Sequence, residues 1–173
     1  MLAEWNSGVF MHLVASLETG IAGTDAALAS QCASALDHVV ENYFNALSNT
    51  LKPPEANEQM KAHVASQPDL LPTLMHTLLN IILFEDCPNQ WSLSRPLLGL
   101  VLTNQDKFAV LRQQLSSMAL SNCEEAKQAE RAQSLQQAFD KLMSDVQPNL
   151  EPRNREIFTR NVNTFRAMMK NML

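Results

Sequence analysis

The sequence predicts an all-α fold in which antiparallel helix pairs form a segment of an α-solenoid. Apolar residues recur at intervals of three and four over most of the 173 residues, and no stretch alternates convincingly at the period of two that marks a strand. Four glycines and 6% aromatic residues, beside many Leu, Ala, Gln and Met, favour helix over sheet. We expect about four helix pairs and no domain boundary across residues 1–173.

The first helix is expected over about residues 4–17, and Gly20 and Gly23 should end it, because glycine often follows the last turn of a helix. Its apolar face consists of Phe10, Leu13, Val14 and Leu17. In a solenoid the outer side of this helix would normally pack on a preceding repeat. We therefore expect an exposed apolar patch made of Trp5, Val9 and Phe10.

The next two helices are separated by a proline break. Thr24 or Asp25 can cap a helix whose apolar stripe is wide enough to pack on two neighbours. That stripe consists of Leu28, Cys32, Ala35, Val39, Tyr43 and Ala46, with Leu36, Val40, Phe44 and Leu47 alongside. Residues 51–54, which read LKPP, are expected to form a surface loop. A weakly amphipathic helix over residues 55–66 follows, with Met60 and Val64 on its apolar side.

Residues 78–102 contain two apolar runs on either side of a polar joint. The first run completes a helix over residues 70–84 that is apolar almost all round, which predicts burial on most sides. Pro88 stops that helix, because it lacks an amide donor and disfavours the α region at Cys87. Ser94 can cap the next helix with Pro96 in its first turn. The alternative is one long helix from Pro88 that is kinked at Pro96.

Trp91 and Arg95 are the most informative residues of this joint. Trp91 is a large apolar side chain among polar neighbours, and we interpret it as filling the seam between the two helices. Arg95 would then bond Glu85, Asp86 or the carbonyl groups of a neighbouring helix. The alternative is a surface role, because an exposed Trp near an Arg is a good hot spot for a protein partner. These four residues therefore form either a structural joint or a partner contact.

Three further helices are predicted in the carboxy-terminal half, each with strict three-four spacing. Their stripes are Phe108, Leu111, Leu115 and Met118; then Ala132, Leu135, Phe139, Leu142 and Val146; then Phe158, Val162, Phe165, Met169 and Met172. Short loops between such helices predict antiparallel neighbours packed along one seam. The pairs recur at roughly 40 residues, the size of a HEAT-type unit, so we expect HEAT-like packing.

Charge and chemistry exclude several classes of function. Residues 1–90 carry ten acids and two lysines, a net charge of −8, which does not suit nucleic acid but suits a basic protein surface or plain solvation. No apolar run approaches the roughly 18 residues of a membrane span. His12, His38, His63 and His76 lack the spacing of a zinc site, and Asp37 and His38 point about 100° apart on a helix.

Cysteine usage gives no sign of catalysis either. Cys87 lies beside Glu85 and Asp86, and two carboxylates disfavour the thiolate that a nucleophile or metal ligand needs. Cys32, Cys87 and Cys123 are odd in number and widely spaced, which favours a reducing compartment over a disulfide framework. We therefore expect no catalytic residue, no cofactor and no metal, and a protein that is not an enzyme.

The joint and two flanking segments resemble one family. The pattern FEDC-x-NQW-S-x-SRPLLGL occupies residues 84–100, ALDHVV occupies residues 35–40, and NREIFTRN occupies residues 154–161. Together they resemble the carboxy-terminal part of nuclear transport receptors of the exportin-7 and Ran-binding protein 17 type, within the importin-β superfamily. The resemblance runs from about residue 26 to about residue 165 without a large gap.

This resemblance implies a HEAT-repeat scaffold that carries protein cargo between nucleus and cytoplasm under control of the GTPase Ran. Nuclear pore proteins would be further partners. Receptors of this family are many times longer, so the chain is expected to be a fragment that lacks the amino-terminal repeats holding the main Ran contact. It would supply the carboxy-terminal arch and a possible cargo surface. The alternative is a free-standing helical adaptor, or a truncated fragment without transport activity.

Overall fold

The computed structural model describes residues 6–85, 90–121 and 123–172, which form eight α-helices and one short 3-10 turn, with no strand among them. The all-α prediction is confirmed. The helices are α1 (Ser7–Ile21), α2 (Ala26–Leu47), α3 (Glu55–Ala65), α4 (Leu70–Phe84), α5 (Gln90–Thr103), α6 (Gln105–Ser121), α7 (Gln128–Leu142) and α8 (Pro152–Lys170).

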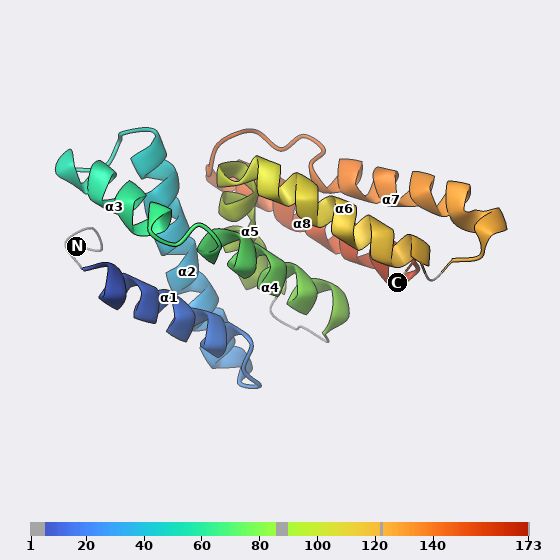
Figure 1. Ribbon diagram of the computed structural model, residues 1–173, viewed down its shortest axis with the longest axis horizontal. Helices are drawn as coiled ribbons and strands as arrows, with labels where there is room; N and C mark the ends of the chain where they lie inside the picture. Colours follow the sequence, from blue (N-terminus) through green and yellow to red (C-terminus); the bar gives the residue numbers. More distant parts are fainter. Residues whose placement is uncertain (1–5, 86–89, 122, 173) are drawn as a thin grey trace.

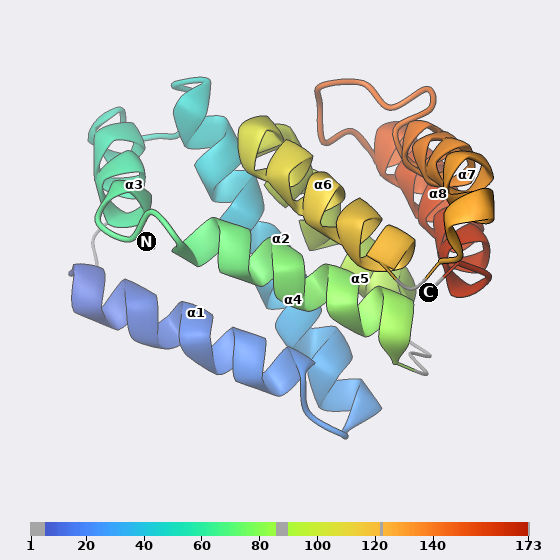
Figure 2. The same ribbon diagram turned by 45° about the vertical axis from the view of Figure 1, so that its right-hand side comes forward.

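The helices form two layers, as an α-solenoid requires. In one layer α2 packs on α5 and α5 packs on α8, and each of these pairs with a partner helix, α1, α4 and α7 respectively. Figure 2 shows α1, α4 and α6 in front of α2 and α5, and a hydrogen bond of 2.7 Å from Thr77 Oγ1 to Glu18 Oε1 joins α4 to α1. The eight helices therefore make three pairs, with α3 packed on α2 and α6 lying against α4 and α7. Figure 1 shows α6, α7 and α8 extending together away from α1–α3.

A side-chain cap explains where α2 begins. Asp25 caps α2 as expected, because its Oδ1 accepts hydrogen bonds from the amides of Ala27 and Leu28 at 2.9 and 3.0 Å. The predictions for residues 55–66 and 70–84 are confirmed by α3, in which Met60 and Val64 are buried, and by α4. No helix in the described part of the chain is long and apolar enough to cross a membrane.

The end predicted for the first helix is wrong. α1 continues through Gly20 to Ile21, because this glycine serves close packing and not termination. A Cβ added at Gly20 would overlap the Sγ of Cys32 on α2. The expected exposed patch is also partly wrong, since Phe10 is only 1% exposed and stacks on His63 of α3. Val9 is 47% exposed as expected, and Trp5 lies outside the described residues.

The predicted stripes hold in the middle of helices and fail at their ends. Leu28 at the start of α2 and Leu47 at its end are about half exposed, and Ala29 and Ala33 are buried instead. At the end of α6, Ala119 is buried whereas Met118 is 54% exposed. The stripe of α8 is confirmed in full, because α8 packs on α7 on one side and on α5 and α4 on others.

The cap predicted at Ser94 is wrong, and the alternative of one longer helix is closer to the structure. α5 begins at Gln90 and continues through Ser94 and Pro96, both of which are buried. Farther along α5, Gly99 faces α2 so closely that an added Cβ would overlap Cγ1 of Val40. The crossing of α2 and α5 therefore depends on the absence of a side chain at residue 99.

Gly99→Ala should lower the free energy of unfolding by about 1–3 kcal/mol, the usual cost of overpacking a core. This loss would occur although alanine favours a helix over glycine by about 1 kcal/mol. Urea denaturation followed by circular dichroism measures it. As a control, the double variant Gly99→Ala and Val40→Ala should lose less free energy of unfolding than the two single variants added together, because alanine at residue 40 leaves room for the added methyl group. A Gly99→Ala variant as stable as the wild type would contradict the close crossing.

Candidate partner-binding surface

Trp91 lies on the outer side of α5 and is 59% exposed, so the prediction that it fills the seam between helices is wrong. The buried face of α5 consists of Leu93, Ser94, Pro96, Leu97, Leu98, Gly99, Leu100 and Val101. At 100° per residue, Trp91 and Arg95 fall outside the sector that these residues occupy. The Arg95 guanidinium carbon lies 4.7 Å from the centre of the Trp91 ring, a cation–π contact. Trp91 and Arg95 thus form one surface unit, the Trp91–Arg95 pair.

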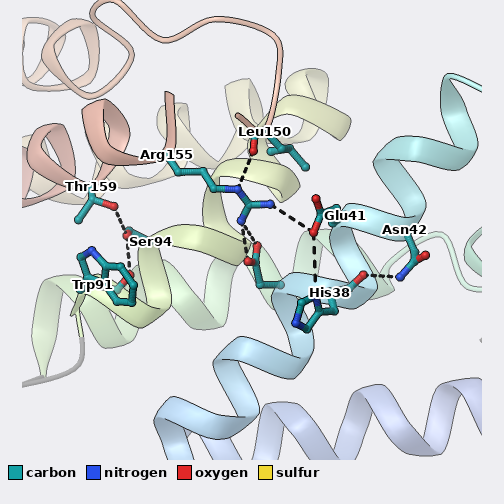
Figure 3. A network of polar contacts seen from close by, with 9 residues as sticks. His38, Glu41, Asn42, Trp91, Ser94, Leu150, Arg155 and Thr159 are labelled. Carbon is teal, nitrogen blue, oxygen red and sulfur yellow. Dashed lines mark hydrogen bonds and ion pairs between the residues drawn. The ribbon is translucent and has the colours of Figure 1, made fainter. Parts of the chain in front are cut away.

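Two serines, one on either side of this pair around the helix, fix α5 to its neighbours. Ser94 Oγ donates to the Trp91 carbonyl at 2.9 Å and lies 2.6 Å from Thr159 Oγ1 of α8 (Figure 3). Ser92 Oγ lies 2.8 Å from Ser30 Oγ of α2. Ser94 is therefore a bridge between two helices and not a cap, and the first turn of α5 is held by both α2 and α8.

The bond expected for Arg95 is made by another arginine. Arg166 of α8 donates from Nη2 to the carbonyl of Glu85 at 2.8 Å. The Gln90 carboxamide, oriented with its oxygen toward α8, accepts from Arg166 Nε at 2.9 Å and donates to Asn163 Oδ1 at 2.7 Å. Arg166 therefore joins the end of α4 to the start of α5. Asp86, the remaining predicted joint residue, lies outside the described residues, and so does Cys87.

A buried ion pair connects α2 to α8 and was missed by the sequence analysis. Arg155 Nη1 donates to both carboxylate oxygens of Asp37 at 2.6 Å, and its Nε donates to the carbonyl of Leu150 at 2.8 Å (Figure 3). The side chains of Arg155 and Asp37 are 8% and 12% exposed. The half-exposed Glu41 lies 3.5 Å from Arg155 Nη2 and 3.9 Å from His38 Nδ1. As expected from the helical geometry, Asp37 is buried while the His38 side chain is exposed.

One signal in the sequence could have revealed this pair. Asp37 lies between the core residues Leu36 and Val39, and Arg155 precedes the core residue Phe158 by one helical turn. A charged residue on an apolar face needs a partner, because an unpaired buried charge is strongly destabilising. Two such residues of opposite sign, on helices predicted to pack in one array, would have predicted an ion pair.

The remaining titratable candidates are structural or dispersed. His63 is buried, lies 3.1 Å from Ser7 Oγ through Nδ1 and stacks on Phe10 with ring centres 5.2 Å apart. Across residues 6–85, 90–121 and 123–172, no three His, Cys, Asp or Glu side chains gather in a way that could hold a metal ion. We therefore take the Trp91–Arg95 pair as the candidate site.

Comparisons with known proteins identify the family. The chain is 35% identical over 170 residues to exportin-7-B of Xenopus laevis and 34% identical over 165 residues to Ran-binding protein 17 of Homo sapiens. Over these residues it matches the exportin-7 and Ran-binding protein 17 family, as a fragment of such a protein would. These alignments cover 95% and 91% of the chain but only 15% and 14% of the relatives, so the chain spans about a seventh of their length. No family model matches the chain, and no solved structure matches it.

The three segments that carry the family resemblance meet in space. Residues 35–40 lie on α2, residues 90–100 lie on α5 and residues 154–161 lie on α8. The contacts between them are the Asp37–Arg155 ion pair, the Ser94–Thr159 hydrogen bond and the close approach of Gly99 to Val40. The segments that carry the resemblance therefore include residues that fix α2, α5 and α8 to one another.

Arg155→Met should reduce the free energy of unfolding by about 3–5 kcal/mol, because it leaves the Asp37 carboxylate buried without its partner. Removing both charges with Asp37→Leu and Arg155→Met should cost less than removing one. Arg153→Met is the matched control, since Arg153 is exposed on the same turn of α8 and its loss should change stability by no more than about 0.5 kcal/mol. Equal destabilisation by the two arginine variants in urea titrations would show that the buried pair has no special weight.

Proposed function

We propose that this chain is a protein-binding segment of a nuclear transport receptor, in which the Trp91–Arg95 pair contacts protein cargo. The observation that carries the proposal is the exposure of Trp91 with Arg95 stacked on it. Trp and Arg are the residues most enriched at the energetic centres of protein interfaces. The printed names of the relatives, exportin and Ran-binding protein, support a receptor whose partners are proteins.

The packing around α5 supports this role. The Ser94–Thr159 and Ser30–Ser92 hydrogen bonds fix the first turn of α5, so a partner would meet a Trp whose backbone is already ordered. A fixed side chain loses less conformational entropy on binding, which improves affinity. The stacked guanidinium also restricts the indole ring and supplies donors for a carboxylate or carbonyl of the partner.

We propose further that residues 1–173 form one continuous part of the carboxy-terminal arch of such a receptor, and that it acts by binding and not by catalysis. Ran and nuclear pore proteins would bind the full-length receptor, which would move between nucleus and cytoplasm. The names of the relatives, an exportin and a Ran-binding protein, support a role without catalysis. The low coverage of the relatives supports the alternative of a fragment without transport activity of its own.

Trp91→Ala should abolish or strongly weaken capture of cargo while leaving the free energy of unfolding within about 0.5 kcal/mol of the wild type, as for other exposed residues. Capture is measured from nuclear and cytoplasmic extracts with and without Ran–GTP, and is followed by titration of each purified cargo. Val110→Ala, which truncates an apolar side chain of α6 that is 51% exposed, is the control and should leave both quantities unchanged.

Two results would argue against this role for Trp91. A loss of about 3–5 kcal/mol in Trp91→Ala, the range for truncating a buried Trp, would mean that the side chain belongs to the core. Unchanged cargo capture by a stable Trp91→Ala variant would remove it from the interface.

The isolated chain should bind Ran–GTP weakly or not at all. We expect the main Ran contact to lie in amino-terminal repeats of the full-length receptor, and the chain spans about a seventh of its relatives. Calorimetric titration of the chain with Ran loaded with a non-hydrolysable GTP analogue measures this affinity, with Ran–GDP as the control. Tight binding that depends on the nucleotide would place a Ran surface within this segment.

A further inference from the structure

We propose that the corner between α7 and α8 binds an acidic segment of a partner protein. The loop from Met143 to Glu151 and the first half of α8 enclose a cavity of about 670 Å³. This volume is within the range of sites that hold small ligands or a few side chains. The cavity is separate from the Trp91–Arg95 pair, because its lining comes from the α7–α8 loop, the end of α7 and α8, and none of it comes from α5.

The floor of the cavity is preformed by two buried asparagines of α8. Asn154 is 4% exposed, and its side chain accepts from the amide of Gln147 at 2.8 Å and donates to the carbonyls of Gln147 and Asn149 at 2.7 and 2.6 Å. Asn161 is 7% exposed and donates to the carbonyls of Leu142 and Ser144 at 3.2 and 2.8 Å. These five hydrogen bonds fix the loop to the helix, so a ligand would not have to order the wall of the cavity.

Three cations line this cavity without partners of their own. Within the part of the chain that the structure describes, Lys141, Arg153 and Arg160 form no ion pair and donate no side-chain hydrogen bond. Two carboxylates, Asp145 and Glu151, line it as well, but neither lies within ion-pair distance of these cations. Unpaired guanidinium groups at a preformed cavity are suited to bind carboxylates, which they can bond through two parallel N–H donors.

The chemistry of the lining favours an acidic peptide over nucleic acid. No aromatic side chain lines the cavity, so bases would find nothing on which to stack. A continuous phosphate backbone would also have to pass Asp145 and Glu151, whereas a peptide can space its carboxylates to reach the cations and avoid these two residues. The half-buried Ile157 offers one apolar contact of the kind that peptide side chains use.

Fluorescence anisotropy of the full chain with a labelled, terminally blocked peptide rich in glutamate tests the proposal at low salt, with the matching glutamine peptide as a control. The double variant Arg153→Gln and Arg160→Gln should weaken binding of the glutamate peptide about tenfold or more, because two charge-assisted contacts are lost. Lys170→Gln, which removes one positive charge from an exposed residue of α8 outside the cavity, should change it less than about twofold. Thermal unfolding checks that all variants fold.

Several outcomes would overturn the proposal. These are absence of binding to the glutamate peptide, equal binding to the glutamine peptide, and equal loss in the double variant and in Lys170→Gln. Tighter binding of a single-stranded RNA oligonucleotide through Arg153 and Arg160 would replace the acidic peptide by nucleic acid. Self-association that disappears in the double variant, measured by sedimentation, would replace it by a second copy of the chain. Trp91→Ala should leave peptide binding unchanged, so the two surfaces are tested separately.

Discussion

A buried carboxylate is strongly destabilising when it has no partner, and here a residue of α8 supplies the partner of a residue of α2. Asp37 occupies the buried face of α2, and Arg155 is the residue of α8 that meets it. The same arginine bonds the carbonyl of Leu150, so the loop before α8 is placed by the same side chain. α5 lies between the two helices, where Gly99 allows close contact with α2 and Ser94 bonds Thr159 of α8. One electrostatic constraint thus orders three helices that are distant in sequence.

The exposed candidate residues lie on helices that are fixed by buried polar contacts. α5 exposes Trp91 and Arg95, and its Ser92 and Ser94 form hydrogen bonds with neighbouring helices. In the first half of α8, buried Asn154 and Asn161 organise the loop while Arg153 and Arg160 remain unpaired. In both places, buried hydrogen-bonded side chains fix the backbone that carries the exposed side chains. The positions of these exposed side chains therefore depend on buried hydrogen bonds. Replacing an exposed side chain would leave those buried hydrogen bonds in place.

The sequence predicted what periodicity controls and failed where tertiary contacts decide. The apolar stripes of α3 and α8 were predicted because their three-four spacing persists along each helix. Leu28 and Met118 were misassigned because the buried face of each helix is shifted there by one residue, to Ala29 and Ala119. Ser94 was read as a cap since Ser is a preferred N-cap residue, yet residues 90–93 continue the helix when α2 and α8 bind its first turn. Trp91 was assigned to the interior on its size, whereas the buried face of α5 was filled by Leu93, Leu97 and Leu100.

The triangle formed by α2, α5 and α8 has a mechanical consequence for this helical array. Each pair of these helices has one contact: an ion pair between α2 and α8, a hydrogen bond between α5 and α8, and close steric contact between α2 and α5. Together these contacts oppose sliding of any one helix past the others. On the outer layer, α1 is joined to α4 by the Thr77–Glu18 hydrogen bond, and α6 meets α7 through the exposed contacts of Arg112 with Gln136 and Asp140. Exposed polar contacts of this kind exchange with water at little cost. We expect that bending of this helical array would change the contacts of the outer layer first. The relative positions of α2, α5 and α8 would then stay unchanged while the curvature of the array changes.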